Sequence, residues 1–377
     1  MTAFLAERRR NAAERNAALP VPTIKDEHWR YTNLRGIDFG AFAPVASPVV
    51  LTAGSLPAGV LFMDLEQAAA EHPELIERHL GAIVGTDEKF AAENAALWTD
   101  GVLVYVPKGV QVDEPLKATF TIPEHGAAQQ WRVLVIAEEG SRVAFMEEHA
   151  EGLPGYANGV AELHVGANAN VEYVSFQHRH LETLHFASHR AEVARDAELD
   201  WVAVALGSKT GKSRMESRLT GPGSTAKLTG AYVLDGTQHV DLDTTQEHDA
   251  PNATSDLFFK GVLSESARSV WRGVIRVAKD AQKTDAYQEN RNLVLSPKAH
   301  ADSIPGLEIK ANDVRCTHGA TIGRVDPEAL YYLMSRGLDR PAAERLIVEG
   351  FFVDAFARIR SPELREQVQK ALLAKLP

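Results

Sequence analysis

The chain has 377 residues, 45% of them hydrophobic and 24% charged, which is ordinary for a globular protein and long enough for two or three structural units. Its 51 acidic against 40 basic side chains give a net charge of -11, which argues against a nucleic-acid-binding surface. A single cysteine excludes an intrachain disulfide framework and indicates a reducing compartment, and no segment has the pattern of a secretory signal or a transmembrane helix. We therefore expect a cytoplasmic protein without a membrane or nucleic-acid role.

The N-terminal part of the chain predicts a mixed, largely helical region. Residues 1–19 carry apolar side chains at loosely helical spacing among charges, and two prolines directly afterwards end this helix. The alanine-rich segments 64–80 and 87–98 have apolar side chains at i, i+3 and i+4 and predict further helices. We take residues 1–100 as an N-terminal helical region.

From Gly101 onward, short β-branched segments bounded by glycine and proline replace the helical pattern. Apolar anchors that follow turn residues are 28, 28, 29 and 42 residues apart, at Val143, Val171, Leu199, Leu228 and Val270. A period near 28, with a half-period near 14 that also includes Leu242 and Leu257, is typical of stacked coils, because each coil returns to the same lateral position. For residues 101–325 the sequence therefore favours a β-solenoid over a sandwich or barrel.

After Gly323 the pattern becomes helical again. Three pairs of a capping residue and a following proline predict helix starts, at Asp326, Asp339 and Ser361. In the last of these helices apolar side chains recur every four residues, which predicts one buried face. Residues 326–377 thus predict a C-terminal helical subdomain that covers the end of a sheet or docks a partner.

Three polar motifs in the solenoid region have structural explanations. Gly207–Ser213 resembles a phosphate-binding loop, but it has three residues between its glycines where the nucleotide-binding pattern needs four, and no helix follows, so we predict a turn. The spacing of four clustered histidines matches no metal-site signature, which favours surface or inter-coil hydrogen bonding for His178, His180, His185 and His189. Alternating amides predict stacking between coils for Gln288, Asn290 and Asn292.

The single cysteine lies two positions before a histidine. Alternation along a strand sends Cys316 and His318 to one face, with their Cα atoms roughly 7 Å apart. Sulfur and imidazole both bind metals, but a tetrahedral site needs about four ligands and the chain has no second thiolate. Three interpretations stay open: a small buried hydrophobe, the nucleophile of a stand-alone Cys-His hydrolase or transferase, and half of a site completed by a partner chain.

The segments 305–323 and 330–337, which include Cys316 and His318, resemble the SufB/SufD family of iron-sulfur cluster assembly proteins. Further segments are also similar to this family, at 26–34, 90–95 and 284–293. The first of these, and the form Cys-x-His-Gly-Ala-Thr, resemble the SufD branch. The likeness runs from about residue 20 to residue 360.

This resemblance implies a right-handed parallel β-helix core with helical regions at both ends, and a scaffold subunit rather than an enzyme. It implies pairing with a SufB-like subunit through the β-helix and docking of a SufC-like ATPase through the C-terminal helices. ATP-driven dimerisation of SufC would then open the SufB/SufD interface, where a transient iron-sulfur cluster forms. His318 and Cys316 match positions proposed to face that interface, with His318 the stronger candidate and persulfide acceptance left to the partner. We expect the chain alone to bind no cofactor, and pairing of two copies through the same edge stays open.

Overall fold

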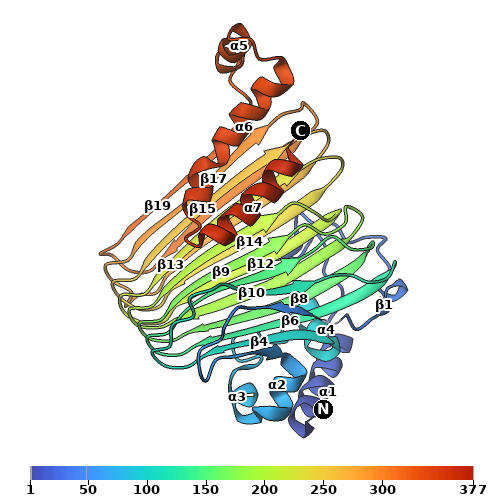
Figure 1. Ribbon diagram of the computed structural model, residues 1–377, viewed down its shortest axis with the longest axis vertical. Coiled ribbons are helices and arrows are strands. Elements are labelled where there is room, and N and C mark those ends of the chain that lie inside the picture. Colours follow the sequence, from blue (N-terminus) through green and yellow to red (C-terminus); the bar gives the residue numbers. More distant parts are fainter. Residues whose placement is uncertain (1, 48, 377) are drawn as a thin grey trace.

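The computed structural model describes residues 2–47 and 49–376. The protein is mainly β, with 42% strand and 23% helix. Two sheets of mainly parallel strands face each other and wind as a β-solenoid of about eight turns, with helices at both ends of the chain (Figure 1). The prediction of a parallel solenoid with terminal helical regions is confirmed.

Each coil contributes one strand to each sheet. Sheet A contains β1 (Ala43–Pro44), β3 (Leu61–Asp64), β4 (Asp100–Val106), β6 (Ala127–Ala137), β8 (Gly155–Val165), β10 (Leu184–Val193), β12 (Thr210–Leu219), β14 (His239–His248), β16 (Arg268–Val277) and β18 (His300–Ile309). Sheet B contains β2 (Val50–Thr52), β5 (Leu116–Phe120), β7 (Arg142–His149), β9 (Asn170–Gln177), β11 (Glu198–Ala205), β13 (Thr225–Leu234), β15 (Thr254–Leu263), β17 (Asp285–Val294) and β19 (Arg315–Gly323). From β4 and β5 onward, neighbours in each sheet are alternate strands of the sequence, as stacked coils require.

The strand register explains the repeat seen in the sequence. Val171 pairs with Leu199, 28 residues later, so this spacing is one coil. The next coil is shorter, because Leu199 pairs with Ala226, and Leu228 pairs with Trp201 instead. The predicted match of Leu199 with Leu228 is therefore wrong by two residues. A shift of two keeps a side chain on the same face, so the apolar pattern survives the error.

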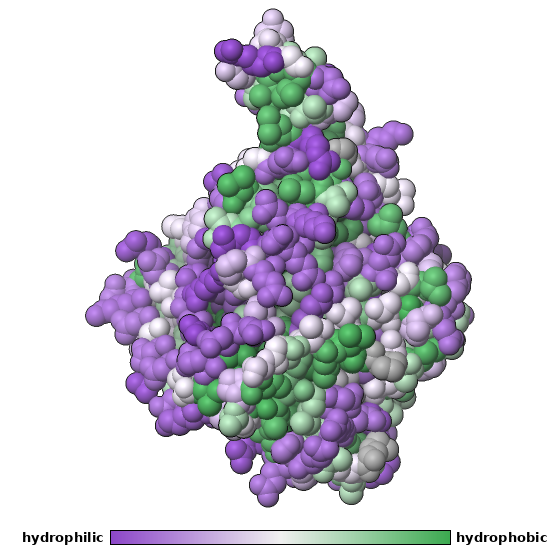
Figure 2. Space-filling model, in the orientation of Figure 1, coloured by the Kyte–Doolittle hydropathy of each residue, from purple (hydrophilic) through white to green (hydrophobic). Residues whose placement is uncertain are grey.

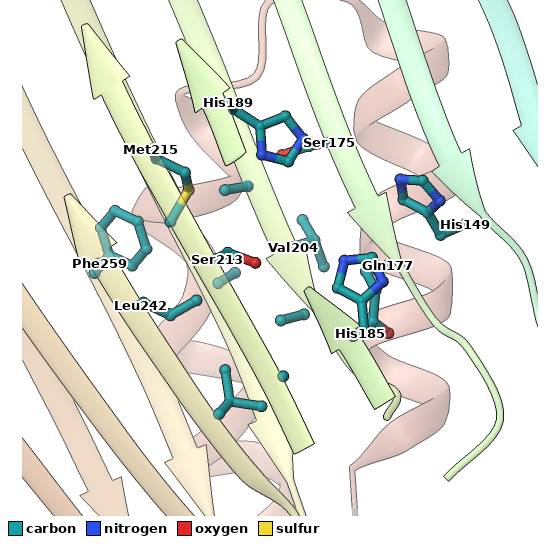
Figure 3. Close-up of a pocket in the computed structure, with 15 residues that line it drawn as sticks. His149, Ser175, Gln177, His185, His189, Val204, Ser213, Met215, Leu242 and Phe259 are labelled. Carbon is teal, nitrogen blue, oxygen red and sulfur yellow. The ribbon is translucent and has the colours of Figure 1, made fainter. Parts of the chain in front are cut away.

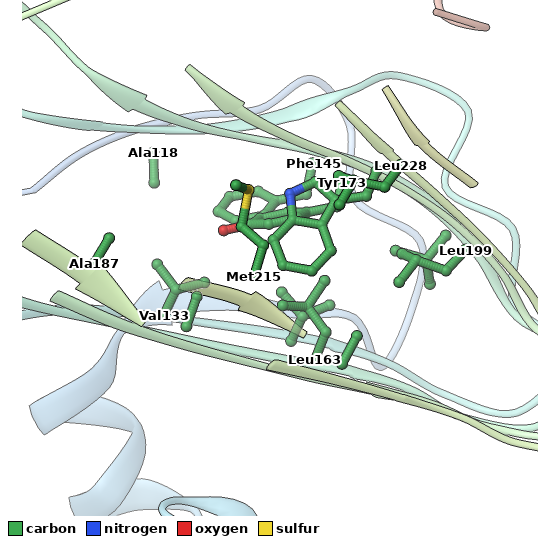
Figure 4. Packing of buried hydrophobic residues seen from close by; sticks show 14 of the residues in the cluster. Ala118, Val133, Phe145, Leu163, Tyr173, Ala187, Leu199, Met215 and Leu228 are labelled. Atoms are coloured by element: carbon green, nitrogen blue, oxygen red, sulfur yellow. The ribbon is translucent and has the colours of Figure 1, made fainter. Parts of the chain in front are cut away.

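Side chains from the two sheets fill the interior of the solenoid. Phe145 and Tyr173 of sheet B meet Val133, Leu163 and Met215 of sheet A between the sheets (Figure 4). Each of these side chains is at most 2% exposed. The solenoid is thus a packed core rather than an open tube, and its stability depends on apolar burial in successive coils.

The N-terminal helices cover the outer face of sheet A. They are α1 (Ala3–Ala18), α2 (Leu65–Glu71), α3 (Pro73–His79) and α4 (Lys89–Leu97). Leu5, Leu65 and Ile76 pack on Leu103 and Leu134 of that face. The helix predicted for residues 64–80 is two helices, because Pro73 lacks the amide hydrogen that would continue the first one.

The C-terminal helices begin at the three predicted caps. They are α5 (Pro327–Ser335), α6 (Arg340–Ala357) and α7 (Pro362–Lys375), and the side chains of Asp326, Asp339 and Ser361 accept hydrogen bonds from the first turns. The four-residue repeat of α7 packs on the outer face of sheet B, whereas α5 projects beyond the sheets (Figure 1). Among the helices of residues 2–47 and 49–376, none combines the length and apolar character needed to cross a bilayer.

Candidate functional site at the open end of the solenoid

The two ends of the solenoid differ in whether another strand pairs with the outermost coil. At the N-terminal end, the short antiparallel strands β2 and β3 pair with β5 and β4. At the C-terminal end, β18 and β19 are the last strands of their sheets, and no other described strand lies beside their outer edges. An uncovered edge presents unpaired backbone N–H and C=O groups to another chain. The C-terminal end is therefore the candidate site of interaction.

Cys316 and His318 both lie on β19, the outermost strand of sheet B. Cys316 pairs with Ala286 and His318 with Gln288 of β17. Cys316 is half-buried against an apolar cluster that includes Ile275, whereas His318 is exposed. The prediction of a strand here is confirmed, and it places both side chains at the end of the molecule.

The surroundings of Cys316 do not activate its thiol. Burial raises the pKa of the thiol, and the carboxylate of Asp285 raises it further. A reactive cysteine needs the opposite, a lowered pKa that leaves a thiolate at neutral pH. The raised pKa of the thiol therefore argues against the Cys-His hydrolase or transferase.

The imidazole of His318 is the more available ligand of the pair. It makes no side-chain hydrogen bond or ion pair with any residue in the described ranges. Within residues 2–47 and 49–376, no three His, Cys, Asp or Glu side chains are arranged to hold a metal ion. Cys316 and His318 supply two ligands at most, so a metal cluster bound here would need ligands from elsewhere.

A layer of buried amides lies directly beneath this strand. Gln288 Nε2 donates across the lumen to Gly273 O at 3.3 Å and to Gly306 O at 3.1 Å. Asn292 Nδ2 donates to Asn290 Oδ1 at 2.6 Å within the same strand. The predicted stacking of amides between coils is wrong, because the residues paired with these three amides in the adjacent coils are not amides. Instead, the hydroxyl of Tyr232, from another coil, donates to Asn292 Oδ1 and accepts from Asn290 Nδ2 at 3.4 Å. Gln288 thus joins the two sheets at the last coils, and the asparagines bond within sheet B.

The clustered histidines divide between the surface and the lumen. His178 Nε2 lies 3.1 Å from Glu148 Oε1, and His180 Nδ1 accepts from the Glu182 amide at 3.1 Å, as the prediction of hydrogen bonding requires. His185 and His189 instead point into the lumen, near His149 (Figure 3). The surface alternative is wrong for His185 and His189, because both are buried on β10. His189 Nε2 lies 3.5 Å from Glu147 Oε2, so its polar partner belongs to another coil.

The interior polar groups form a structural network around Glu147. Its Oε1 accepts from Trp131 Nε1 at 2.7 Å and from His149 Nε2 at 2.6 Å, and Arg179 Nη2 donates to His149 Nδ1 at 2.9 Å. Burial alone would raise the pKa of Glu147, but His189 and His149 hold it well below its usual value. Burial lowers the pKa of His149 to about 4. The enclosed space beside His149 measures about 30 Å³, room for about two water molecules, so it is no substrate pocket.

Sequence reasoning missed Glu147 and His149, which come some thirty residues before the histidine cluster. Their only signal is their position at alternate residues of β7, after the apolar residues 143–146, with Glu148 between them.

The segment that resembles a phosphate-binding loop is a turn, as predicted. It joins β11 to β12, Ser208 adopts a positive φ of 67°, and Gly211 already belongs to β12. Lys212 Nζ lies 2.8 Å from Asp241 Oδ1 in a buried ion pair. This lysine is therefore not available to a phosphate.

The segment 26–34, which carries part of the sequence likeness, lies across the outer face of sheet A. His28 Nδ1 lies 2.6 Å from Asp243 Oδ2, and Thr32 Oγ1 donates to Asp241 Oδ2 at 2.6 Å. Trp29 packs on Phe90, with ring centroids 4.9 Å apart. The signature residues of this segment thus attach the N-terminal region to the solenoid.

Comparison with known proteins covers most of the chain. Residues 120–351 match the family model described as "SUF system FeS cluster assembly, SufBD core domain", and residues 46–118 match "SufBD protein N-terminal region". An iron-sulfur cluster assembly SufBD family protein of Mycobacterium tuberculosis is 32% identical over 366 residues, 94% of this chain and 89% of the relative. The iron-sulfur cluster assembly protein SufD of Bacillus subtilis is 31% identical over 324 residues, 84% of this chain and 74% of the relative.

Proposed function

This chain belongs to the SufB/SufD family of SUF-system iron-sulfur cluster assembly proteins, and we propose that it is a SufD-type scaffold subunit with no catalytic activity of its own. In this proposal the chain pairs with a SufB-like subunit and docks a SufC-like ATPase. It also contributes one side of the interface where a nascent cluster forms. The open end formed by β18 and β19, with His318 and Cys316 on its last strand, is the observation that carries the proposal.

The character of the open end supports pairing with another solenoid. Large apolar side chains near it are exposed, with Tyr287 37%, Ile309 39% and Ile322 50% accessible. A partner whose own edge strands continue both sheets would satisfy the backbone groups and cover these side chains. Two copies of this chain would use the same edges, so a homodimer competes with the SufB-like partner when the chain is alone.

The cluster is cargo rather than a resident cofactor in this proposal. His318 is the principal contributor, because its imidazole is exposed on the last strand. Cys316 is the lesser one, because its thiol is half-buried and its pKa is raised. The remaining ligands and the persulfide-accepting cysteine would then belong to the partner.

The C-terminal helices have the surface expected of a docking element. The part that projects beyond the sheets exposes Tyr331 at 75%, Tyr332 at 56% and Met334 at 42%, and hydrophobic residues gather on these projecting helices (Figure 2). Aromatic and methionine side chains are enriched where proteins bind each other. We assign this projection to the SufC-like ATPase.

We propose a separate role for each of the three regions of the chain. Residues 1–100 brace the solenoid, residues 101–325 present the interface, and residues 326–377 hold the ATPase. A reducing cytoplasm, as the single cysteine suggests, is the proposed location.

The test is reconstitution with SufB and SufC from the same source. We expect the three chains to elute as one complex, and failure to form it under native conditions contradicts the proposal. His318→Ala should leave the complex intact but block cluster maturation in cells. His125→Ala, an exposed histidine in a loop outside the last coils, is the matched control and should mature clusters normally. Normal maturation by His318→Ala would remove that residue from the site.

A further inference from the structure

The two edge strands of the open end, β18 and β19, differ in the backbone groups that they present to another chain. His300 N donates to Ala267 O at 3.0 Å and Lys310 N donates to Val277 O at 3.0 Å, so the even-numbered positions of β18 bond to β16. The register pairs residues 268–277 with 300–309 one to one. Alternation therefore directs the N–H and C=O groups of the odd-numbered residues to the open edge.

The residue at the centre of the β18 edge is a proline. The residues of β18 whose backbone groups face the open edge are Ala301, Ser303, Pro305, Leu307 and Ile309. Proline has no backbone N–H, so the middle position offers an acceptor without a donor, and the ring occupies the place of the hydrogen. Prolines within sheets are found at edge positions that face away from the neighbouring strand. The middle of β18 is therefore a poor place for another strand to pair.

The edge of β19 is complete. Arg315 N donates to Thr284 O at 2.9 Å, so the odd-numbered residues of this strand bond to β17. The backbone groups of the even-numbered residues face the open edge, at Cys316, His318, Ala320 and Ile322. Each of these residues has both a donor and an acceptor. A strand of another chain can therefore pair with β19 along its length.

The centres of the two edges lie opposite each other across the lumen. Gln288, the neighbour of His318 in β17, donates to Gly273 O at 3.3 Å and to Gly306 O at 3.1 Å. Gly273 in turn pairs with Pro305. A two-fold axis perpendicular to the sheets that passes beside Pro305 thus also passes beside the middle of β19. Two copies joined about this axis would pair both edges with their own counterparts.

Pro305 interrupts such symmetric pairing twice, because each copy contributes one proline. In the register that pairs all the edge-facing residues of β18, the two prolines meet at the axis and neither supplies a donor. A shift by two residues separates the prolines, but each then faces a carbonyl that receives no hydrogen bond from it. An axis along the strands would instead join β18 to β19 of the second copy, with one interruption in each sheet. A different partner without a proline at this place meets a single interruption.

We propose that Pro305 is a specificity-determining residue, which disfavours pairing between two copies of this chain and leaves the open end to a different partner. A proline at an exposed edge is a known means of avoiding edge-to-edge association. The partner that fits is a solenoid end that pairs fully with β19 and has a backbone N–H group at every position that faces β18. This inference rests on the proposed function, since it concerns the choice of partner at the same interface.

The experiment measures self-association of the full chain by sedimentation equilibrium. Pro305→Val restores the N–H group and keeps an apolar side chain, so the dissociation constant for two copies should fall by about tenfold or more. Pro305→Ala restores the same group with a smaller side chain and repeats the test. Ile322→Lys, added to Pro305→Val, should reverse the gain, because it places a charge on β19. Pro222→Val, at an exposed proline in the turn between β12 and β13, is the matched control and should associate like the parent chain.

Circular dichroism checks that each variant is folded, and co-elution with the SufB-like subunit separates this inference from the proposed function. We expect Pro305→Val to retain the heterocomplex, with a homodimer that competes more strongly than that of the parent chain. Unchanged self-association of the Pro305 variants, or a gain that survives Ile322→Lys, overturns the inference and leaves the proposed function in place. Failure of the parent chain to form the heterocomplex contradicts the proposed function instead.

Discussion

The first and last strands of the solenoid differ in what covers them. In β4 every residue except Tyr105 is buried, beneath α2 and β3, whereas no residue of β19 is buried. Both strands join their neighbours through the same kind of parallel ladder. The difference therefore lies in the covering elements and not in the strands' own pairing. A nine-residue edge that is left open is a place to receive another chain.

The chain has helices that could have covered this edge, but it places them elsewhere. The helices α6 and α7 pack on the outer face of sheet B, against strands such as β13 and β15. The N-terminal helices, in contrast, lie on sheet A near its first strands. One end of the solenoid is thus covered by elements of the same chain, whereas the described residues leave the edge strands of the other end uncovered.

The largest effect should come from the closed interior. Trp131→Ala removes a fully buried ring and leaves Glu147 without one of its donors, so we expect a loss of about 3–5 kcal/mol in unfolding free energy. Tyr331→Ala, whose ring is 75% exposed, is the control and should change stability by no more than about 0.5 kcal/mol. Urea unfolding followed by circular dichroism measures both. Similar losses of unfolding free energy in the two variants would contradict the expected difference between the interior and the surface.

A pH effect should also belong to the interior. Burial lowers the pKa of His248 from 6.5 to about 4. As pH falls through 6.5 the unfolded chain takes up the proton first, so unfolding free energy should fall between pH 6.5 and 4, by up to roughly 3 kcal/mol for this group.

His248→Gln should flatten that dependence when urea unfolding is repeated across the pH range. The exposed His125→Gln should leave it unchanged. An identical slope for the parent chain and His248→Gln would exclude this residue as a source of acid sensitivity.

A substitution at the open end should leave the stability of the isolated chain unchanged but weaken its binding to the partner. Ile322→Lys places a charge on a side chain that is 50% exposed, so the isolated chain should keep its unfolding free energy within about 0.5 kcal/mol. Binding to the SufB-like partner should weaken at least tenfold, measured by co-elution and calorimetry. Val50→Lys, 61% exposed on β2 at the other end, is the matched control and should bind normally. Equal binding by both variants would move the interface away from β19.

The smallest effect concerns the thiol. Cys316→Ala should lower unfolding free energy by less than about 1 kcal/mol, because the side chain is small and half-buried. Because its pKa is raised, Cys316 should react with iodoacetamide more slowly at pH 7 than free N-acetylcysteine, and faster as the pH rises. Rapid labelling at neutral pH would instead support the hypothesis of a stand-alone Cys-His enzyme.

The elements that were predictable have local causes. The caps at Asp326, Asp339 and Ser361 start helices because their side chains bond to amides in the next turn. The solenoid was visible because coils of nearly equal length bring apolar residues back to one face. The assignment of His185 and His189 to the surface failed because burial between the two sheets depends on residues of other coils.

The sequence by itself determined the repeat, the starts of the C-terminal helices, and the strand that carries Cys316 and His318, since each follows from alternation or capping among near neighbours. Only the tertiary structure decided that β19 is an uncovered edge and that the thiol pKa is raised. These properties depend on residues far apart in the chain, or on the absence of a covering element. The spacing of residues along a short stretch of sequence gives no information on distant residues or on missing covering elements.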